Sequence, residues 1–106
     1  MDAALISIYT EWSIDHKPFK TRQQYNVNWS EIIVISNNCG MIRTEERIID
    51  NILLRITKWN NVDSYDKWLS NSIVQDYISM RDSYNREHGI INNLSFIHNA
   101  NKNNTL

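Results

Sequence analysis

Glycine, cysteine and proline are scarce in this 106-residue chain, which contains two, one and one of them. With two glycines the chain has no glycine-rich loop of the kind that binds phosphate through backbone amides. The sequence therefore predicts no nucleotide-dependent enzyme. The single cysteine, Cys39, has no partner for an intrachain disulfide. Because such a chain fits a reducing compartment, we expect the protein to be cytoplasmic.

An excess of charge of either sign is also missing. Lys and Arg number 11 against 12 Asp and Glu, which gives a formal net charge of −1. No overall field therefore draws the protein to nucleic acid or to an anionic membrane. The N-terminus lacks a basic region followed by a long apolar run, and no stretch approaches the ~20 apolar residues that a bilayer requires. We expect neither a signal peptide nor a membrane span.

Segment 44–60 carries hydrophobic residues at three- and four-residue steps, the spacing of one helix face. Thr44 is a suitable N-cap for it. A second stripe of this kind covers residues 64–88 and ends at Gly89, which accepts the left-handed conformation that follows many helices. The short turn between the two segments requires antiparallel packing. The sequence therefore predicts an all-α fold, a small bundle of four or five helices around the pair 44–60/64–88.

The N-terminal third supports two readings. Residues 2–16 have helix start and stop signals, but they also alternate like a half-buried strand. Residues 25–36 alternate as well, although Ser30 as N-cap and Gly40 as terminator favour a helix over 30–39. We predict helices in both places. The alternative is an α+β fold in which residues 4–14 and 25–36 form a β-hairpin packed on the helix pair.

The C-terminal part is predicted to close the core with one more short helix over residues 90–97. Residues 99–106 are almost entirely polar and predict a frayed tail. The expected organisation is one helical domain over 1–98, followed by this tail.

Catalytic and metal-binding patterns are weak. Cys39 with His16, His88 or His98 could form a thiolate–imidazole pair, but a lone cysteine is more often a small core residue. The three histidines lack metal-ligand spacing. We therefore predict no catalytic residue, no metal, no cofactor and no enzymatic activity.

A helix-turn-helix can be drawn over residues 21–39, with 30–39 as the recognition helix. That helix has no basic residue, and Asn37 and Asn38 are its only plausible base-reading side chains. DNA binding is therefore disfavoured but not excluded.

The helical projection of the predicted pair leaves several residues off its main apolar stripes. Either they lie in the core beneath the N-terminal segment, or they form an apolar patch with a charged rim that binds another protein or a second copy. This candidate partner-binding set is Leu54, Lys58, Lys67, Trp68, Val74, Ile78 and Arg81.

The predicted function is that of a non-enzymatic protein–protein interaction module, such as a small inhibitor, immunity or accessory protein of a phage or another mobile element. This step rests on size and composition by analogy. Its partner is expected to be another protein of unknown identity, with homo-oligomerisation as a further option. The alternative function is that of a small helix-turn-helix DNA-binding regulator.

Overall fold

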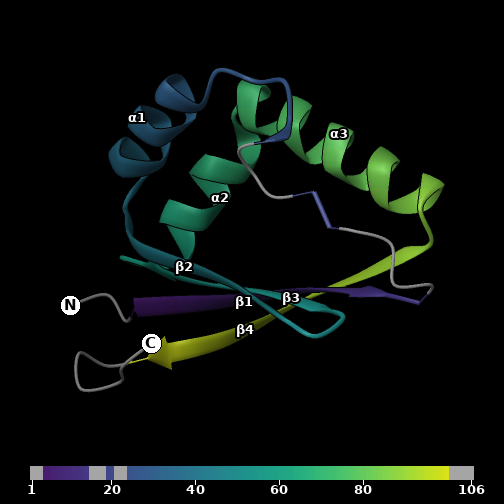
Figure 1. Cartoon of the computed structure of the whole chain (residues 1–106). Coiled ribbons are helices and arrows are strands. Elements are labelled where there is room, and N and C mark those ends of the chain that lie inside the picture. The colour runs from purple at the N-terminus through teal and green to yellow at the C-terminus, as the bar shows by residue number, and fades with distance from the viewer. Residues whose placement is uncertain (1–3, 15–18, 21–23, 101–106) are drawn as a thin grey trace.

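A computed structural model describes residues 4–14, 19–20 and 24–100 of the chain. These residues form four strands and three helices in the order β1 (Ala4–Ser13), α1 (Trp29–Cys39), β2 (Met41–Ile49), β3 (Ile52–Trp59), α2 (Val62–Ser70), α3 (Ser72–Glu87) and β4 (Ile90–Ala100). The strands make one antiparallel sheet in the order β2-β3-β1-β4. All three helices lie over the same face of this sheet, and no described element covers the other face (Figure 1).

The all-α prediction is wrong, because segment 44–60 is a β-hairpin. Ile49 of β2 pairs with Ile52 of β3, which leaves Asp50 and Asn51 as a two-residue loop. Asp50 has a φ of 53°, a left-handed conformation that Asp and Asn tolerate better than most residues. The many β-branched side chains that suggested a helical stripe also suit a strand, and pairing with β1 stabilises that choice.

The predicted helix 64–88 exists, but it is divided into α2 and α3. Asn71 lies between the two helices in an extended conformation, and its side-chain oxygen accepts hydrogen bonds from the amides of Ile73 and Val74. This cap starts a new helix and turns the chain. Asn61 caps α2 in the same way, through the amide of Ser64.

The predictions for the N-terminal third have different outcomes. Helix 30–39 is confirmed as α1, which Asn28 caps and Gly40 ends at a φ of 108°. Residues 4–13 are a strand instead of a helix. The alternative hairpin of 4–14 with 25–36 is also wrong, because β1 pairs with β3 and β4.

The predicted C-terminal helix is wrong as well, because residues 90–97 belong to β4, where pairing with β1 overrides their weak helical pattern. The division into a domain over 1–98 and a tail over 99–106 stays a prediction. Residues 101–106 of that tail lie outside the described residues. None of the helices in the described ranges is both long and apolar enough to cross a membrane.

The two faces of the sheet differ in an unexpected way. Side chains directly opposite each other in an antiparallel pair point to the same face. On the helix-covered face the middle of the central strands presents Ser7, Tyr9, Glu11, Arg55 and Thr57. The buried side chains of Leu5, Leu53 and Trp59 flank them on the same face. The uncovered face of the same strands is richer in isoleucine. The helix-covered side therefore combines a small apolar core with a polar centre, and this centre positions the candidate site.

Candidate functional site: a polar and aromatic cavity between sheet and helices

A cavity of about 440 Å³ lies between the sheet and the three helices, and residues from all seven elements line it. This volume is within the range of small-molecule sites. Its walls are mainly aromatic and aliphatic, with hydroxyl groups and two guanidinium groups among them. The lining residues include Tyr9, Trp29, Arg55, Trp68, Tyr77, Ile78 and Arg81.

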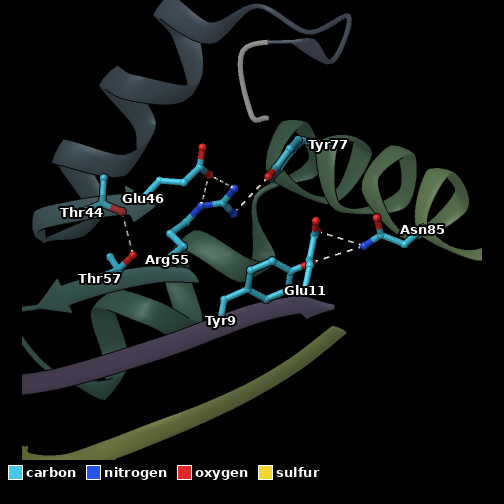
Figure 2. A network of polar contacts seen from close by, with 8 residues as sticks. All are labelled: Tyr9, Glu11, Thr44, Glu46, Arg55, Thr57, Tyr77 and Asn85. Atoms are coloured by element: carbon cyan, nitrogen blue, oxygen red, sulfur yellow. Dashed lines mark hydrogen bonds and ion pairs between the residues drawn. The ribbon is translucent and has the colours of Figure 1, made fainter. Parts of the chain in front are cut away.

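One polar cluster of the cavity is centred on Arg55 of β3 (Figure 2). Its Nε and Nη2 donate to the same carboxylate oxygen of Glu46, at 3.0 Å and 2.5 Å, and Nη1 donates to the Tyr77 hydroxyl at 3.2 Å. Thr44 and Thr57 share a hydrogen bond of 2.9 Å beside this pair. Burial acts to lower the pKa of Arg55, but Tyr77 and Glu46 outweigh it and raise that pKa. Arg55 therefore stays cationic in the cavity wall.

A second cluster lies on β1 and α3. The Tyr9 hydroxyl donates to Oε2 of Glu11 at 2.5 Å, and Nδ2 of Asn85 donates to the same oxygen at 3.0 Å (Figure 2). Glu11 and Asn85 are each 2% exposed. Within the described residues, Oε1 of Glu11 and Oδ1 of Asn85 have no hydrogen-bond partner. The cluster is thus a buried carboxylate with one oxygen saturated and the other without a donor.

Arg81 of α3 joins the cavity to this second cluster. Its guanidinium carbon lies 4.3 Å from the centre of the Tyr9 ring and 5.9 Å from that of Tyr77. The hydrogen bond that the structure gives its side chain within the described residues is from Nε to Asp82, at 3.3 Å. The terminal nitrogens are therefore available to a bound molecule. A cation over an aromatic ring in a partly desolvated site is worth roughly 0.5–2 kcal/mol.

Several tyrosines near the cavity are held in the neutral form. Burial raises the pKa of Tyr9; the charge of Arg81 opposes this, and the carboxylate of Glu11 adds to it. Burial also raises the pKa of Tyr25, again with a contribution from Glu11. Burial is also the main reason that the pKa of Tyr65 is raised. Burial thus favours the neutral phenol in all three tyrosines, and the Tyr9 hydroxyl donates to Glu11.

The structure separates the seven residues predicted to bind a partner. Leu54 and Lys58 lie on β3 and point to the uncovered face of the sheet, as their pairing with Thr10 and Ile6 shows. The two residues therefore share one face of a strand, whereas the prediction had placed them on a helix.

The other five predicted residues lie on α2 and α3. Trp68, Ile78 and Arg81 line the cavity, so the structure does bring these three together. Val74 is 0% exposed and belongs to the core, whereas Lys67 is exposed on α2. Whether any of the seven contacts a partner stays a prediction.

The residues that sequence reasoning missed are Tyr9, Glu11, Arg55 and Asn85. Tyr9 and Glu11 stand two residues apart in a segment that alternates apolar and polar side chains, which is the available signal for a shared strand face. Cys39, the earlier candidate nucleophile, is absent from the cavity lining. In the described part of the chain no group of three or more His, Cys, Asp or Glu residues is arranged to hold a metal ion.

No family model matches the chain, and none of the curated proteins matches it. Solved structures match it over nearly its whole length. SnoaB from Streptomyces nogalater, a cofactor-independent oxygenase, is 11% identical with a TM-score of 0.56, covering 98% of this chain and 97% of its own. A dimeric ferredoxin-like protein from an uncultured marine organism is 9% identical with a TM-score of 0.59, covering 98% and 99%. A conserved protein of unknown function from Bacteroides thetaiotaomicron, described as a possible oxidoreductase, is 8% identical with a TM-score of 0.55, covering 92% and 99%.

These similarities correct two predictions. The expectation of a protein without enzymatic activity rested on the weakness of its catalytic and metal-binding patterns, and it is corrected here because the fold is shared by a cofactor-independent oxygenase. The similarities also give no support to an inhibitor role or to a helix-turn-helix DNA-binding regulator. One of these similar structures is described as dimeric. At such low identities the comparisons establish the fold alone, and that fold is the ferredoxin-like α+β sandwich.

Proposed function

We propose that the chain is an enzyme that oxygenates a hydroxylated aromatic molecule bound in the cavity, without a cofactor of its own. The observation that carries this proposal is a small-molecule-sized cavity whose aromatic walls hold the guanidinium groups of Arg55 and Arg81. Trp29, Trp68 and Tyr77 offer ring surfaces to a planar substrate. The likeness to a cofactor-independent oxygenase supports the choice of reaction.

Oxygenation of this kind starts from a substrate anion, because dioxygen accepts electrons readily only from an electron-rich partner. A phenol or enol that loses its proton becomes such a partner. Arg81 is suited to stabilise the anion, since its terminal nitrogens are available and its side chain is only 15% exposed. Arg55 adds positive potential, although Glu46 neutralises much of its charge.

The test is oxygen uptake by the purified protein with a panel of hydroxylated polycyclic aromatics, with isotope-labelled dioxygen traced into the product. We expect uptake with at least one member and label in its product. Arg81→Gln removes charged hydrogen bonds worth roughly 1.5–3 kcal/mol, so kcat/KM should fall roughly 10- to 150-fold. Arg86→Gln is the matched control, because Arg86 is exposed on the same helix and does not line the cavity. Absence of uptake across the panel, or equal effects of both variants, would contradict the proposal.

We also infer that two copies associate through the uncovered face of the sheet. One apolar row crosses the whole sheet on this face. It consists of directly paired residues on neighbouring strands, in the order Ile49 (β2), Ile52 (β3), Trp12 (β1) and Ile91 (β4). Their exposures are 56%, 44%, 47% and 51%. Such a continuous row on a monomer surface is typical of an interface. A second copy fits it, because a symmetric pair would bury the same row twice, as isologous dimers do.

Burying the exposed half of these side chains in both copies contributes roughly 6–12 kcal/mol before the cost of association. The test is the molar mass in solution by light scattering. We expect a dimer for the native chain and a monomer for Ile52→Glu combined with Ile91→Glu. Val34→Glu is the control, because Val34 is 57% exposed on α1, over the opposite face. A monomeric native chain, or a double variant that stays dimeric, would refute this interface.

A further inference from the structure

Glu11 is a carboxylate in the interior, with 2% of its surface exposed. Its Oε2 receives hydrogen bonds from Tyr9 and Asn85, but Oε1 has no donor among the described residues. A buried carboxylate oxygen without a partner costs stability. A glutamine or an apolar residue at this position would lower the stability less, so a purely structural role explains Glu11 poorly.

Tyr9 connects this carboxylate to the cavity. Tyr9 lines the cavity, whereas Glu11 and Asn85 do not belong to its lining within the described residues. The Tyr9–Glu11 hydrogen bond of 2.5 Å has the length of a charge-assisted O–H···O⁻ contact. The Tyr9 hydroxyl is thus hydrogen-bonded to Glu11 from a residue that lines the cavity.

We propose that Glu11 is the proton acceptor for the substrate, acting through Tyr9, and that Asn85 positions its carboxylate. The relay rests on the proposed function, since it produces the anion that reacts with dioxygen. It applies to weak oxygen acids, meaning phenols and enols, whose O–H group can lie against the Tyr9 hydroxyl in the cavity.

The step balances without any oxidant or reductant. The substrate O–H bond breaks and its proton bonds to the Tyr9 oxygen, while the Tyr9 proton bonds to Oε2 of Glu11. The electron pair stays on the substrate, Glu11 becomes neutral and Tyr9 ends as it began. Because burial keeps the pKa of Tyr9 high, a concerted transfer avoids a free tyrosinate. The negative charge moves from Glu11 into the cavity, toward the guanidinium of Arg81.

The experiment uses 4-nitrophenol, whose phenolate form absorbs visible light, as the probe for the purified native chain. At a pH well below the pKa of the free probe, we expect binding to generate the phenolate band. Glu11→Gln should keep binding but lower the bound phenolate fraction at least about tenfold, because an amide cannot accept the proton. Tyr9→Phe should do the same while leaving Glu11 in place, so it serves where Glu11→Gln folds poorly. Glu45→Gln is the control, because Glu45 pairs with Ile56 on the uncovered face and should leave the band unchanged.

A phenolate band that is equal in the native chain and in a folded Glu11→Gln or Tyr9→Phe variant would overturn the relay. So would a native chain that binds the probe only as the neutral phenol. In both cases the proposed oxygenation could still be observed as oxygen uptake with the aromatic panel. A native chain that binds no phenol at all would overturn the relay and the proposed function together. Unfolding transitions of each variant, followed by circular dichroism, distinguish loss of the proton acceptor from loss of structure.

Discussion

The ion pair between Arg55 and Glu46 offers a quantitative test of how the cavity wall is held together. Two guanidinium nitrogens share one carboxylate oxygen, and the two side chains are 11% and 18% exposed. The perturbations are Arg55→Met, Glu46→Gln and the two combined. Each single variant leaves one charged or strongly polar group without its partner, whereas the combined variant removes both charges.

Arg55→Met should lower the free energy of unfolding by about 3 kcal/mol, the low end for a broken buried pair, because Glu46 keeps some contact with water. Glu46→Gln should cost about 2 kcal/mol, since Tyr77 still accepts a hydrogen bond from Arg55. The double variant should cost about as much as Arg55→Met alone, which gives a coupling of about 2 kcal/mol. Urea denaturation followed by tryptophan fluorescence measures all three. Additivity within about 0.5 kcal/mol would refute the pairing inferred from the geometry.

Three further outcomes follow from burial and backbone geometry. Burial raises the pKa of Tyr9 and Tyr25 above 10.0, so the unfolded chain loses these protons first. Their stabilisation is complete below pH 10 and falls above it by roughly 1.4 kcal/mol per pH unit for each ring; a urea midpoint that stays constant there would contradict this. Val74→Asp should abolish cooperative unfolding, because Val74 is 0% exposed. Ile78→Asp should stay folded, as measured by circular dichroism, and should lose affinity for cavity ligands because Ile78 lines the cavity. Gly40→Ala should lower the melting temperature by the equivalent of more than about 1–2 kcal/mol, because φ is 108° and the added carbon would meet an α2 side chain.

Local signals predicted the parts of the fold that depend on local chemistry. Gly40 ends α1 in a left-handed conformation, and Gly89 follows α3 with a φ of 65°, both as the sequence indicated. The hydrophobic stripe over 64–88 also marks real helices. The stripe did not predict the break at Asn71. An asparagine within a helical pattern indicates neither continuation nor a break of the helix, unless its side chain is seen to cap the next turn.

The failure over segment 44–60 has a different cause. Isoleucines spaced for one helix face can equally be divided between the two faces of a pair of strands, and Asp50-Asn51 is a weaker hairpin signal than a turn that contains glycine. The strand conformation is decided by pairing with β1, which joins residues 40 or more positions apart, such as Ile8 and Ile56. Local propensity carries no information about such a partner.

The rule that places apolar residues inside and polar residues outside does not predict the candidate site. Sequence reasoning places apolar residues inside and polar residues outside, yet β1 points Ser7, Tyr9 and Glu11 toward the helices and Ile8 and Trp12 away from them. The usual rule would instead place the face of β1 with Ile8 and Trp12 against the helices. Only the helices on one side of the sheet show which face is inside (Figure 1).

This inversion links the two proposals. The polar centre of the inner face costs stability, because buried carboxylate and guanidinium groups contribute less than well-packed aliphatic side chains of similar volume. An apolar outer row that includes Trp12 and Ile52 costs stability too, unless a second copy covers it. In a dimer joined through the sheets, the outer row becomes a core, and the stability it supplies offsets the cost of keeping Glu11 and Arg55 inside. Proteins break local rules mainly where function requires it. The double variant Ile52→Glu/Ile91→Glu should therefore lower the stability of the protein as well as dissociate the dimer, although neither residue lines the cavity.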